Sequence, residues 1–389
     1  MTTLKLLITG GGTGGHVSPA LATIEAVRAQ AAGAEWTPEF RYIGSRQGVE
    51  AGLAEAAGIS FVGVESGKLR RASSVRGLLT LKNLADALRV PVGIGQAIGE
   101  VRRFWPDAVL ATGGYVSVPT VIAAGLLGRP VLIHEQTVQI GLANKIAARF
   151  ATRIALTFAG AAQELPLSLR SKTFVTGNPV RPVIFGGSKK RAIERFGFDP
   201  ADNNLPTVYV TGGALGAKSI NQAIASCLPA LLENCRVVHQ CGREDGEKFA
   251  AVKSALPPNF TRRYAVVPFV GDEVGDIFAL CDLIVGRSGA GTVTEAAAVG
   301  KAALFIPLVP TGGDEQTRNA QRSVDAGAAG LLPSRDLSGP RLLSEITRLL
   351  TEPASLTAMG QAASTLATPN AAFELADALV ALAMKRKSS

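Results

Sequence analysis

The fold of this chain is decided by one stretch of its sequence, Leu6-Leu7-Ile8-Thr9-Gly10-Gly11-Gly12-Thr13-Gly14-Gly15-His16. An apolar run typical of a buried strand breaks into a glycine turn, and helical spacing follows over residues 17–32. Glycines let a backbone approach a ligand closely, and the free N–H groups at the start of a helix favour negative charge. The stretch therefore predicts an α/β fold with an anion-binding turn, and His16 is the first candidate for chemistry.

The bulk composition fits a two-domain α/β protein. The chain has 389 residues, which is too long for one ordinary domain. Hydrophobic residues make up 47% of it and charged residues 18%, so sizeable cores are expected. Aromatic residues make up only 5% while glycine is abundant, and this suits tightly packed α/β layers better than an all-β sandwich.

The formal net charge of +9 implies an anionic partner, or else a solvated basic surface without a role. Basic residues are not interleaved with aromatic ones, so nucleic acid is not expected as a partner. The four cysteines form no CxxC pair, which argues against a zinc site or a disulfide framework and fits a reducing cytoplasm. The first strand begins almost at Met1 and no run of about 18 apolar residues occurs, so neither a signal peptide nor a membrane span is expected.

The two halves of the chain repeat one plan, in which strand-like runs alternate with helical patterns as in a parallel sheet covered on both faces. In the second half a strand at 207–211 leads into a second glycine turn, 212–217. We expect two Rossmann-like, doubly wound domains that face a cleft, 1–178 and 179–368, with the C-terminal helix, 369–389, joining the first. The expected strands cover residues 4–9, 40–43, 59–64, 107–111, 131–134 and 153–157, and then 207–211, 236–240, 264–267, 282–285, 302–306 and 329–332.

The first glycine turn also satisfies GxGxxG, so a nicotinamide or flavin enzyme is an alternative. That fingerprint needs an acidic residue after the second strand to hold the ribose. The residues after that strand, Gly44-Ser45-Arg46-Gln47, contain none. An NADP site that uses Arg46, or a turn with only a structural role, remains open.

Histidines and a further glycine pair are expected at the same sheet edge. His16 is a candidate general base on a hydroxyl, against a core or helix-capping role. His134 and His239 are interpreted as structural hydrogen-bonding residues, and the spacing of the three histidines predicts no metal site. The segment Gly113-Gly114-Tyr115-Val116-Ser117 either adds free N–H groups to this edge or simply starts the next helix.

The most informative stretch of the second half is Gly286-Arg287-Ser288-Gly289-Ala290-Gly291-Thr292-Val293-Thr294-Glu295. Small residues open a helix whose N–H groups can bind a diphosphate. The carboxylate of Glu295 can accept hydrogen bonds from two vicinal ribose hydroxyls, or it is an acid that merely complements the helix dipole. Gln316, after the next strand, offers a donor and an acceptor to a sugar.

A basic and apolar segment lies within residues 66–90. Its spacing suits an interfacial helix on anionic lipid, or an ordinary amphipathic helix with a solvated basic face. The residues of this expected membrane patch are Arg70, Arg71, Val75, Arg76, Leu78, Leu79 and Lys82.

In six blocks that occur in order, the chain resembles the MurG family of peptidoglycan N-acetylglucosaminyltransferases nearly end to end. The blocks are Gly11-Gly12-Thr13-Gly14-Gly15-His16, Gly113-Gly114-Tyr115-Val116-Ser117, His134-Glu135-Gln136, Gly177-Asn178-Pro179-Val180-Arg181, Arg287-Ser288-Gly289-Ala290 through Glu295, and Gln316-Thr317-Arg318-Asn319-Ala320.

The resemblance implies a GT-B fold and an inverting transfer of N-acetylglucosamine from its UDP donor. The acceptor would be the muramoyl 4-hydroxyl of lipid I, an undecaprenyl-diphosphate-linked pentapeptide sugar, and the product lipid II. The resemblance also implies a peripheral protein at the cytoplasmic side of the bacterial membrane. Its partners would be the anionic inner-membrane surface and cell-wall or division proteins, and it would need no metal or cofactor.

Carried over motif by motif, the resemblance assigns roles to residues of both halves. His16 would be the catalytic base. The donor would be bound by Thr13, Gly14, Gly15, Thr137, Arg181, Ala214, Val270, Ala290, Gly291, Thr292, Val293, Thr294, Glu295 and Gln316. The acceptor side would include Gly11, Gly12, Gly114, Tyr115, His134 and Glu135.

Two positions depart from the family pattern. Thr137 stands where the family usually has Asn, so the paired donor and acceptor of an amide are lost from an expected sugar contact. Ala214 stands where the family usually has Ser, so a hydroxyl on a phosphate is lost while the backbone N–H remains. Activity is expected to survive with weaker donor binding, because the proposed base and ribose acid are both present.

Three alternatives remain to be separated from this interpretation. Two are other GT-B enzymes, a diacylglycerol glucosyltransferase and a UDP-N-acetylglucosamine epimerase. The third is a non-catalytic nucleotide-binding scaffold of a wall-synthesis complex, against which the presence of both His16 and Glu295 argues.

Overall fold

The computed structural model describes residues 1–389 except 47, 68–80, 309–313 and 389, and for 81–88 it describes the backbone alone. The chain divides into two compact units, each with its own sheet. Unit 1 comprises Met1–Arg181 and Thr368–Ser389, and unit 2 comprises Pro182–Pro310 and Asp314–Ala367. The division after Arg181 lies three residues beyond the boundary expected at 178.

The sheet of unit 1 is parallel throughout, with the strand order β3-β2-β1-β4-β5-β6-β7. The order reverses between β1 and β4, whose last paired residues are Thr9 and Ala111. Open α/β sheets bind ligands where the strand order reverses, at the carboxyl ends of the strands. The strands are β1 (Thr2–Thr9), β2 (Trp36–Ser45), β3 (Ser60–Val64), β4 (Ala108–Ala111), β5 (Val131–Glu135), β6 (Arg153–Leu156) and β7 (Thr173–Val175).

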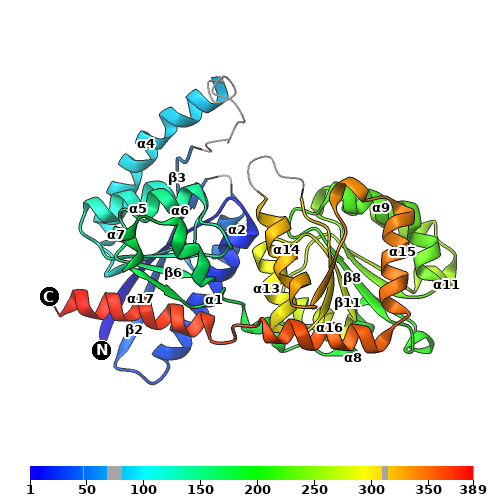
Figure 1. The fold of residues 1–389 in the computed structure, drawn as a ribbon. Coiled ribbons are helices and arrows are strands. Elements are labelled where there is room, and N and C mark those ends of the chain that lie inside the picture. Colours follow the sequence, from blue (N-terminus) through cyan, green and yellow to red (C-terminus); the bar gives the residue numbers. More distant parts are fainter. Residues whose placement is uncertain (47, 68–80, 309–313, 389) are drawn as a thin grey trace. The chain divides into compact units, whose positions relative to one another are not determined.

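Helices cover both faces of this sheet, which explains its nearly continuous apolar strands (Figure 1). Alternate residues of β1 enter different cores: Leu6 and Ile8 join one cluster and Leu7 the other. The helices are α1 (Gly14–Ala31), α2 (Glu50–Ala56), α4 (Leu81–Phe104), α5 (Ser117–Leu126), α6 (Leu142–Ala147), α7 (Leu167–Arg170) and α17 (Ala371–Lys387), with the 3₁₀ turn η1 (Ala159–Glu164).

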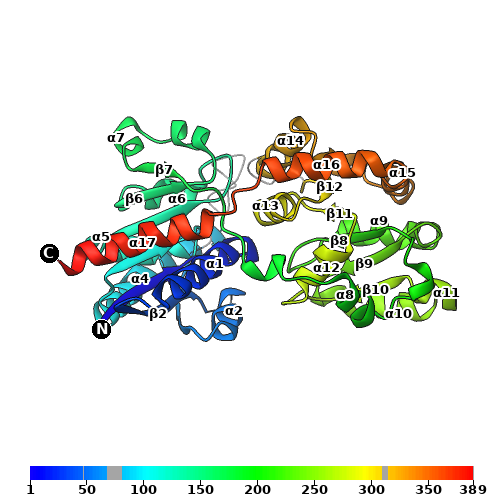
Figure 2. The same ribbon diagram turned by 90° about the horizontal axis from the view of Figure 1, so that it is seen from below.

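The C-terminal helix α17 belongs to unit 1 although it follows all of unit 2 in sequence. It runs beside α1 (Figure 2) and buries Leu375 and Leu379 in the core beneath it. Gln30 of α1 donates a 2.7 Å hydrogen bond to Asp377. The first unit is therefore completed only when the last residues of the chain have returned to it.

Unit 2 repeats the plan with the parallel order β10-β9-β8-β11-β12-β13, which reverses between β8 and β11. Its strands are β8 (Thr207–Thr211), β9 (Arg236–Gln240), β10 (Tyr264–Val267), β11 (Leu283–Gly286), β12 (Ala302–Phe305) and β13 (Ala329–Leu331). Its helices are α8 (Lys189–Phe196), α9 (Lys218–Leu232), α10 (Gly246–Ser254), α11 (Pro258–Thr261), α12 (Val274–Leu280), α13 (Ala290–Ala298), α14 (Glu315–Asp325), α15 (Gly339–Leu350) and α16 (Pro353–Thr365), with the 3₁₀ turns η2 (Pro182–Phe185), η3 (Pro200–Asp202), η4 (Arg243–Asp245) and η5 (Ser334–Asp336).

The expected fold class, two doubly wound parallel-sheet domains, is confirmed. All twelve expected strands are present within a few residues of their expected bounds. β7 was not predicted from the sequence, because three partly exposed residues at a sheet edge give no measurable periodicity. Within the described residues, no helix combines the length and apolar character needed to cross a membrane.

Candidate active site

The glycine turn after β1 lies directly against the turn after β4. Gly11 N–H donates to the Gly113 carbonyl over 3.2 Å. Gly114 has φ of +81°, and a Cβ placed there would lie 2.2 Å from the Gly11 carbonyl oxygen. Only glycine permits both the left-handed backbone and this approach. The two motifs expected at one sheet edge are therefore in contact in unit 1.

A buried carboxylate that was not predicted from the sequence fills the space beneath the first glycine turn. Glu50, the first residue of α2, accepts hydrogen bonds from Gly12 N–H at 3.2 Å and Ser45 N–H at 2.8 Å. Its side chain is fully buried, and a Cβ at Gly11 would lie 2.5 Å from its carboxyl carbon. The Gly12 N–H expected to face an external anion is thus bonded to the protein's own acid.

Glu50 also brings an acid to the end of the second strand. Residues 44–47 contain no acid, but β2 ends at Ser45 and the fold returns Glu50 to that point. A signal was present in the sequence, an acid at the start of the next helix, five residues beyond the strand. Glu50 does not support a dinucleotide site. Its carboxylate accepts hydrogen bonds from N–H groups of the loop, and its side chain is fully buried, so it is not accessible to a ribose.

His16 lies in the first turn of α1, half-buried, with its ring against the second glycine turn. A Cβ at Gly113 would lie 3.3 Å from His16 Nδ1. Nδ1 is 3.1 Å from the Thr112 carbonyl oxygen. A carbonyl oxygen can only accept, so Nδ1 carries the proton and Nε2 of the neutral ring carries the lone pair.

Burial lowers the pKa of His16 below its ordinary value of 6.5, and this effect exceeds the opposing influence of Glu135 and Glu50. Loss of hydration disfavours the charged imidazolium. His16 is therefore neutral at physiological pH, with an unprotonated Nε2. That is the protonation state a general base requires.

The motif His134-Glu135-Gln136 at the end of β5 is buried. Its hydrogen bonds hold the loop that follows it in place. Glu135 accepts from Thr137 N–H, from Gly141 N–H at 2.9 Å and from Asn144 Nδ2 at 2.9 Å. The Thr137 hydroxyl lies 2.8 Å from Glu135 Oε1 and also faces the Gln139 carbonyl. The hydroxyl of Thr137, an expected donor-sugar ligand, is engaged within the protein.

His134 and His239 have structural surroundings. His134 Nε2 donates to the Gly177 carbonyl at 2.9 Å, which ties β5 to the turn that ends unit 1. His239 is enclosed between Tyr264 and Asn221 in unit 2. Burial lowers the pKa of each to about 4, so both remain neutral.

Of the remaining expected residues of unit 1, Thr13, Gly15 and Tyr115 follow the carboxyl ends of β1 and β4. Thr13 and Gly15 are exposed, and Thr13 is the N-cap of α1 without a side-chain capping bond. Tyr115 is half-buried, and a Cβ at Gly12 would lie 2.8 Å from its ring. Arg181, the last residue of the unit's first segment, is half-buried.

In unit 2 the start of α13 follows β11 at the reversal point of the sheet. Among the residues that the structure describes, no acceptor takes the N–H groups of Ala290, Gly291 or Thr292, while Val293 N–H bonds the Gly289 carbonyl. These N–H groups and the helix dipole favour an anion. Glu295 is half-buried in the second turn of α13, beyond the first turn where an acid complements the dipole best.

Polar side chains around this helix start hold its loop in place. Ser288 is buried and donates to the Gln316 carbonyl at 2.7 Å, and Asn319 donates to the Ser288 carbonyl at 3.1 Å. Arg287 donates to the Ile306 carbonyl at 2.9 Å and to Ser219 at 2.8 Å. Arg287 thus joins three segments of unit 2 and does not project as a phosphate ligand.

Three further expected donor residues are half-buried on unit 2. Gln316 Oε1 accepts from Leu308 N–H at 2.9 Å, which fixes the orientation of its amide. Ala214 lies in the turn after β8, where Gly213 N–H bonds Thr211 Oγ1 at 3.0 Å. Val270 follows Phe269, over whose ring Arg243 lies at 4.9 Å.

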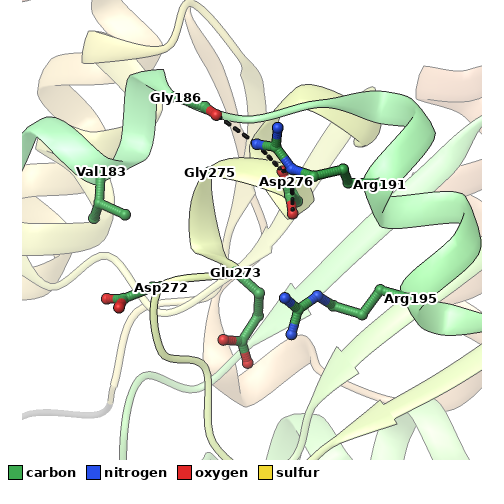
Figure 3. A pocket seen from close by; sticks show the side chains of 8 residues that line it. All are labelled: Val183, Gly186, Arg191, Arg195, Asp272, Glu273, Gly275 and Asp276. Carbon is green, nitrogen blue, oxygen red and sulfur yellow. Dashed lines mark hydrogen bonds and ion pairs between the residues drawn. The ribbon is translucent and has the colours of Figure 1, made fainter.

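A cavity of about 490 Å³ opens beside the loop that follows Val270 (Figure 3). The ion pair between Arg191 and Asp276, 2.8 Å, closes one side of it, and Arg195 and Glu273 point toward each other across another. None of Ala290 to Glu295 lines it. The cavity is therefore separate from the expected diphosphate site.

The expected membrane patch lies outside the described side chains. Its residues between 68 and 80 are not described, and only the backbone of Lys82, in α4, is. Within the described part of the chain, no three His, Cys, Asp or Glu side chains are grouped so that they could hold a metal ion.

Two family models match the chain in its two units. Residues 6–156 match the glycosyltransferase family 28 N-terminal domain, and residues 207–375 match the glycosyltransferase family 28 C-terminal domain. The first match includes the glycine turn with His16, and the second includes the start of α13.

Named proteins are similar over nearly the whole chain. A UDP-N-acetylglucosamine--N-acetylmuramyl-(pentapeptide) pyrophosphoryl-undecaprenol N-acetylglucosamine transferase of Treponema pallidum is 36% identical over 376 residues, 96% of this chain and 94% of that protein. The crystal structure of Acinetobacter baumannii MurG aligns with a TM-score of 0.68 and 28% identity, covering 97% and 99% of the two chains.

A third likeness concerns the fold alone. The UDP-GlcNAc 2-epimerase from Neisseria meningitidis, bound to UDP-GlcNAc, aligns with a TM-score of 0.63 at 14% identity over 97% of this chain and all of that one (100%). At this identity the shared architecture does not distinguish a transferase from an epimerase.

Proposed function

The chain belongs to glycosyltransferase family 28, and we propose that it transfers N-acetylglucosamine from UDP-N-acetylglucosamine to lipid I, which gives lipid II for peptidoglycan synthesis. The observation that carries this conclusion is the 36% identity to a transferase of that name over 96% of the chain. The chain is thus an N-acetylglucosaminyltransferase, and the diacylglycerol, epimerase and scaffold alternatives lack such support.

The reaction is an inverting displacement in which the acceptor hydroxyl attacks the anomeric carbon opposite the departing UDP. Nε2 of His16 takes the hydroxyl proton. Its position on α1, its neutral state and its fixed Nδ1–H support this role. One displacement needs a base and a stabilised leaving group, and no covalent intermediate.

The leaving diphosphate is bound at the start of α13. The N–H groups of Ala290, Gly291 and Thr292 donate to its oxygens. Glu295 accepts from the ribose hydroxyls, Val270 contacts the base through its backbone, and Gln316 contacts the sugar. These N–H groups stabilise the charge that develops on UDP in the transition state.

The protein acts at the cytoplasmic face of the cell membrane as a peripheral enzyme, because its acceptor is anchored there by a lipid. The basic and apolar residues between 70 and 82 bind the anionic surface. Cell-wall and division proteins are its partners at that surface. Replacement of Arg70, Arg71 and Arg76 by Glu together should weaken cosedimentation with anionic vesicles, and unchanged binding would contradict this role.

A direct assay tests the proposed activity. Purified protein is incubated with labelled UDP-N-acetylglucosamine and a lipid I analogue, and the label in the lipid product is measured. Diacylglycerol as acceptor and a reaction without acceptor are the controls. Transfer to the lipid I analogue alone is expected. Transfer to diacylglycerol, conversion of the donor to its epimer, or no transfer at all would each contradict the proposal.

A further inference from the structure

Thr112, the residue after β4, holds His16 at two points. The Thr112 hydroxyl donates to the His16 backbone carbonyl over 2.6 Å, and the Thr112 carbonyl accepts from His16 Nδ1 over 3.1 Å. Thr112 is 0% exposed. One buried residue at the end of β4 therefore bonds both the backbone and the ring of a residue at the start of α1.

Gln136, the residue after β5, completes this arrangement. Its Nε2 donates to the same Thr112 carbonyl oxygen over 2.7 Å, and its side chain is buried. The oxygen has two lone pairs, which are thus occupied by His16 and Gln136. The ring also packs against Gly113, where a Cβ would lie 3.3 Å from Nδ1. Rotation of the imidazole would break the Nδ1 hydrogen bond and the contact with Gly113 together.

We propose that Thr112 is a positioning residue for His16, which keeps the imidazole in the Nδ1–H tautomer and aims Nε2 at the acceptor hydroxyl. This inference rests on the proposed role of His16 as the base. A base must stand within hydrogen-bond reach of the proton that it takes, and a shift of about 1 Å in a reacting group can lower a rate about 100-fold. The Thr112 hydroxyl matters because its hydrogen bond holds the backbone of His16 beside the end of β4. The position from which the imidazole extends is therefore fixed.

The tautomer is measured first, without reference to activity. The chain has three histidines. His134 Nε2 faces the Gly177 carbonyl, and His239 Nε2 faces Asn221 Oδ1 at 3.1 Å, so both are Nε2–H tautomers. Long-range ¹H–¹⁵N spectra at neutral pH should show one Nδ1–H histidine, and His16→Gln should remove that one. Loss of an Nε2–H pattern instead would overturn the proposal.

The hydroxyl is tested by a set of three variants. Thr112→Val removes the hydroxyl at constant shape and should lower kcat about 10- to 100-fold with an unchanged donor KM. The Thr112 carbonyl is retained in this variant, so His16 should keep its Nδ1–H tautomer while its backbone loses the bond to the hydroxyl. Thr112→Ser, which keeps the hydroxyl, should recover most of the activity.

Thr120→Val is the matched control. Thr120 is also fully buried, and its hydroxyl has no hydrogen-bond partner among the described residues. This variant should retain the wild-type kcat. Equal loss in Thr112→Val and Thr120→Val, or a wild-type kcat in Thr112→Val, would overturn the positioning role. If Thr112→Val does not fold, Thr112→Ala, which also lacks the hydroxyl, is measured in its place.

Failure of this inference can be told from failure of the proposed function. If His16→Ala keeps the wild-type kcat, His16 is not the base and the proposed mechanism fails, whatever the spectra show. If His16→Ala is inactive while Thr112→Val is fully active with an unchanged tautomer, only the inference about Thr112 fails.

Discussion

The turn after β1 in unit 1 and the start of α13 in unit 2 were both expected to bind anions, and the structure equips them differently. In unit 1 the Gly12 N–H is bonded to the buried carboxylate of Glu50. In unit 2 the polar side chains around α13 bond one another and the loop, and the described part of the chain supplies no acceptor for Ala290, Gly291 or Thr292 N–H. A strand–glycine–helix sequence thus predicts an anion site only where the protein does not supply the anion itself.

We infer from this difference that the two units have different roles in the reaction. The turn of unit 1 is held rigid by its own acid and presents a neutral histidine, whereas the helix start of unit 2 is left for a ligand. Substitutions in unit 1 should therefore change kcat, and substitutions in unit 2 should change the KM of the donor. The four predictions that follow test this contrast.

The largest effect is expected at His16. His16→Ala should lower kcat about 10²- to 10⁴-fold, the usual contribution of a general base. The affinity for UDP, measured by calorimetry, should change little. Thermal unfolding serves as the control for folding. If His16→Ala lowered the affinity for UDP by the same factor as kcat, His16 would be a donor-binding residue. The proposed difference in role between the two units would then be wrong.

The next effect is expected at Glu295. Glu295→Ala should raise the donor KM about 10- to 100-fold with a smaller change in kcat, since hydrogen bonds to a charged group contribute about 1.5–3 kcal/mol. Glu247→Ala, which removes an exposed first-turn acid from α10, is the matched control for an effect on helix charge. If the donor KM is the same in both variants, Glu295 has no ribose contact.

Glu50→Gln should act on stability and on the pH profile. One of the two N–H groups would face an amide nitrogen, and an unsatisfied buried group costs about 1–3 kcal/mol in the free energy of unfolding. The Glu50 charge raises the pKa of His16, so its removal should lower that pKa further and move the acid limb of kcat to lower pH. In the wild type that limb should already lie below pH 6.5. A shift to higher pH would contradict the placement of Glu50 beside His16.

The smallest effect is expected at Ala214. Ala214→Ser restores the hydroxyl usual in the family and should lower the donor KM by a few-fold, about the value of one hydrogen bond at 0.5–1.5 kcal/mol. The kcat should be unchanged, since the residue lies in unit 2. Steady-state kinetics at varied donor concentration decide this. A change in kcat without a change in the donor KM would contradict the proposed difference in role between the two units.

The parts of the fold that could be predicted were those with a local signal. Both glycine turns, both sheets and twelve strands follow from apolar periodicity and from turn residues. The three residues of β7 were missed because so short an edge strand has no period. The inward engagement of Thr137 was also unforeseen, since it depends on a carboxylate, Glu135, whose direction no local pattern reveals.

Strand periods, glycine turns and motif order are properties of neighbouring residues, so two parallel-sheet units, the family and the candidates His16 and Glu295 could be inferred from the order of residues. The folded chain was needed to show that Glu50 occupies the first turn, that Thr112 and Gln136 fix the ring of His16, and that α17 returns to unit 1. These contacts join residues from 24 to over 300 positions apart. They arise because buried polar groups must find partners and apolar helix faces must be covered, wherever in the chain the partner lies.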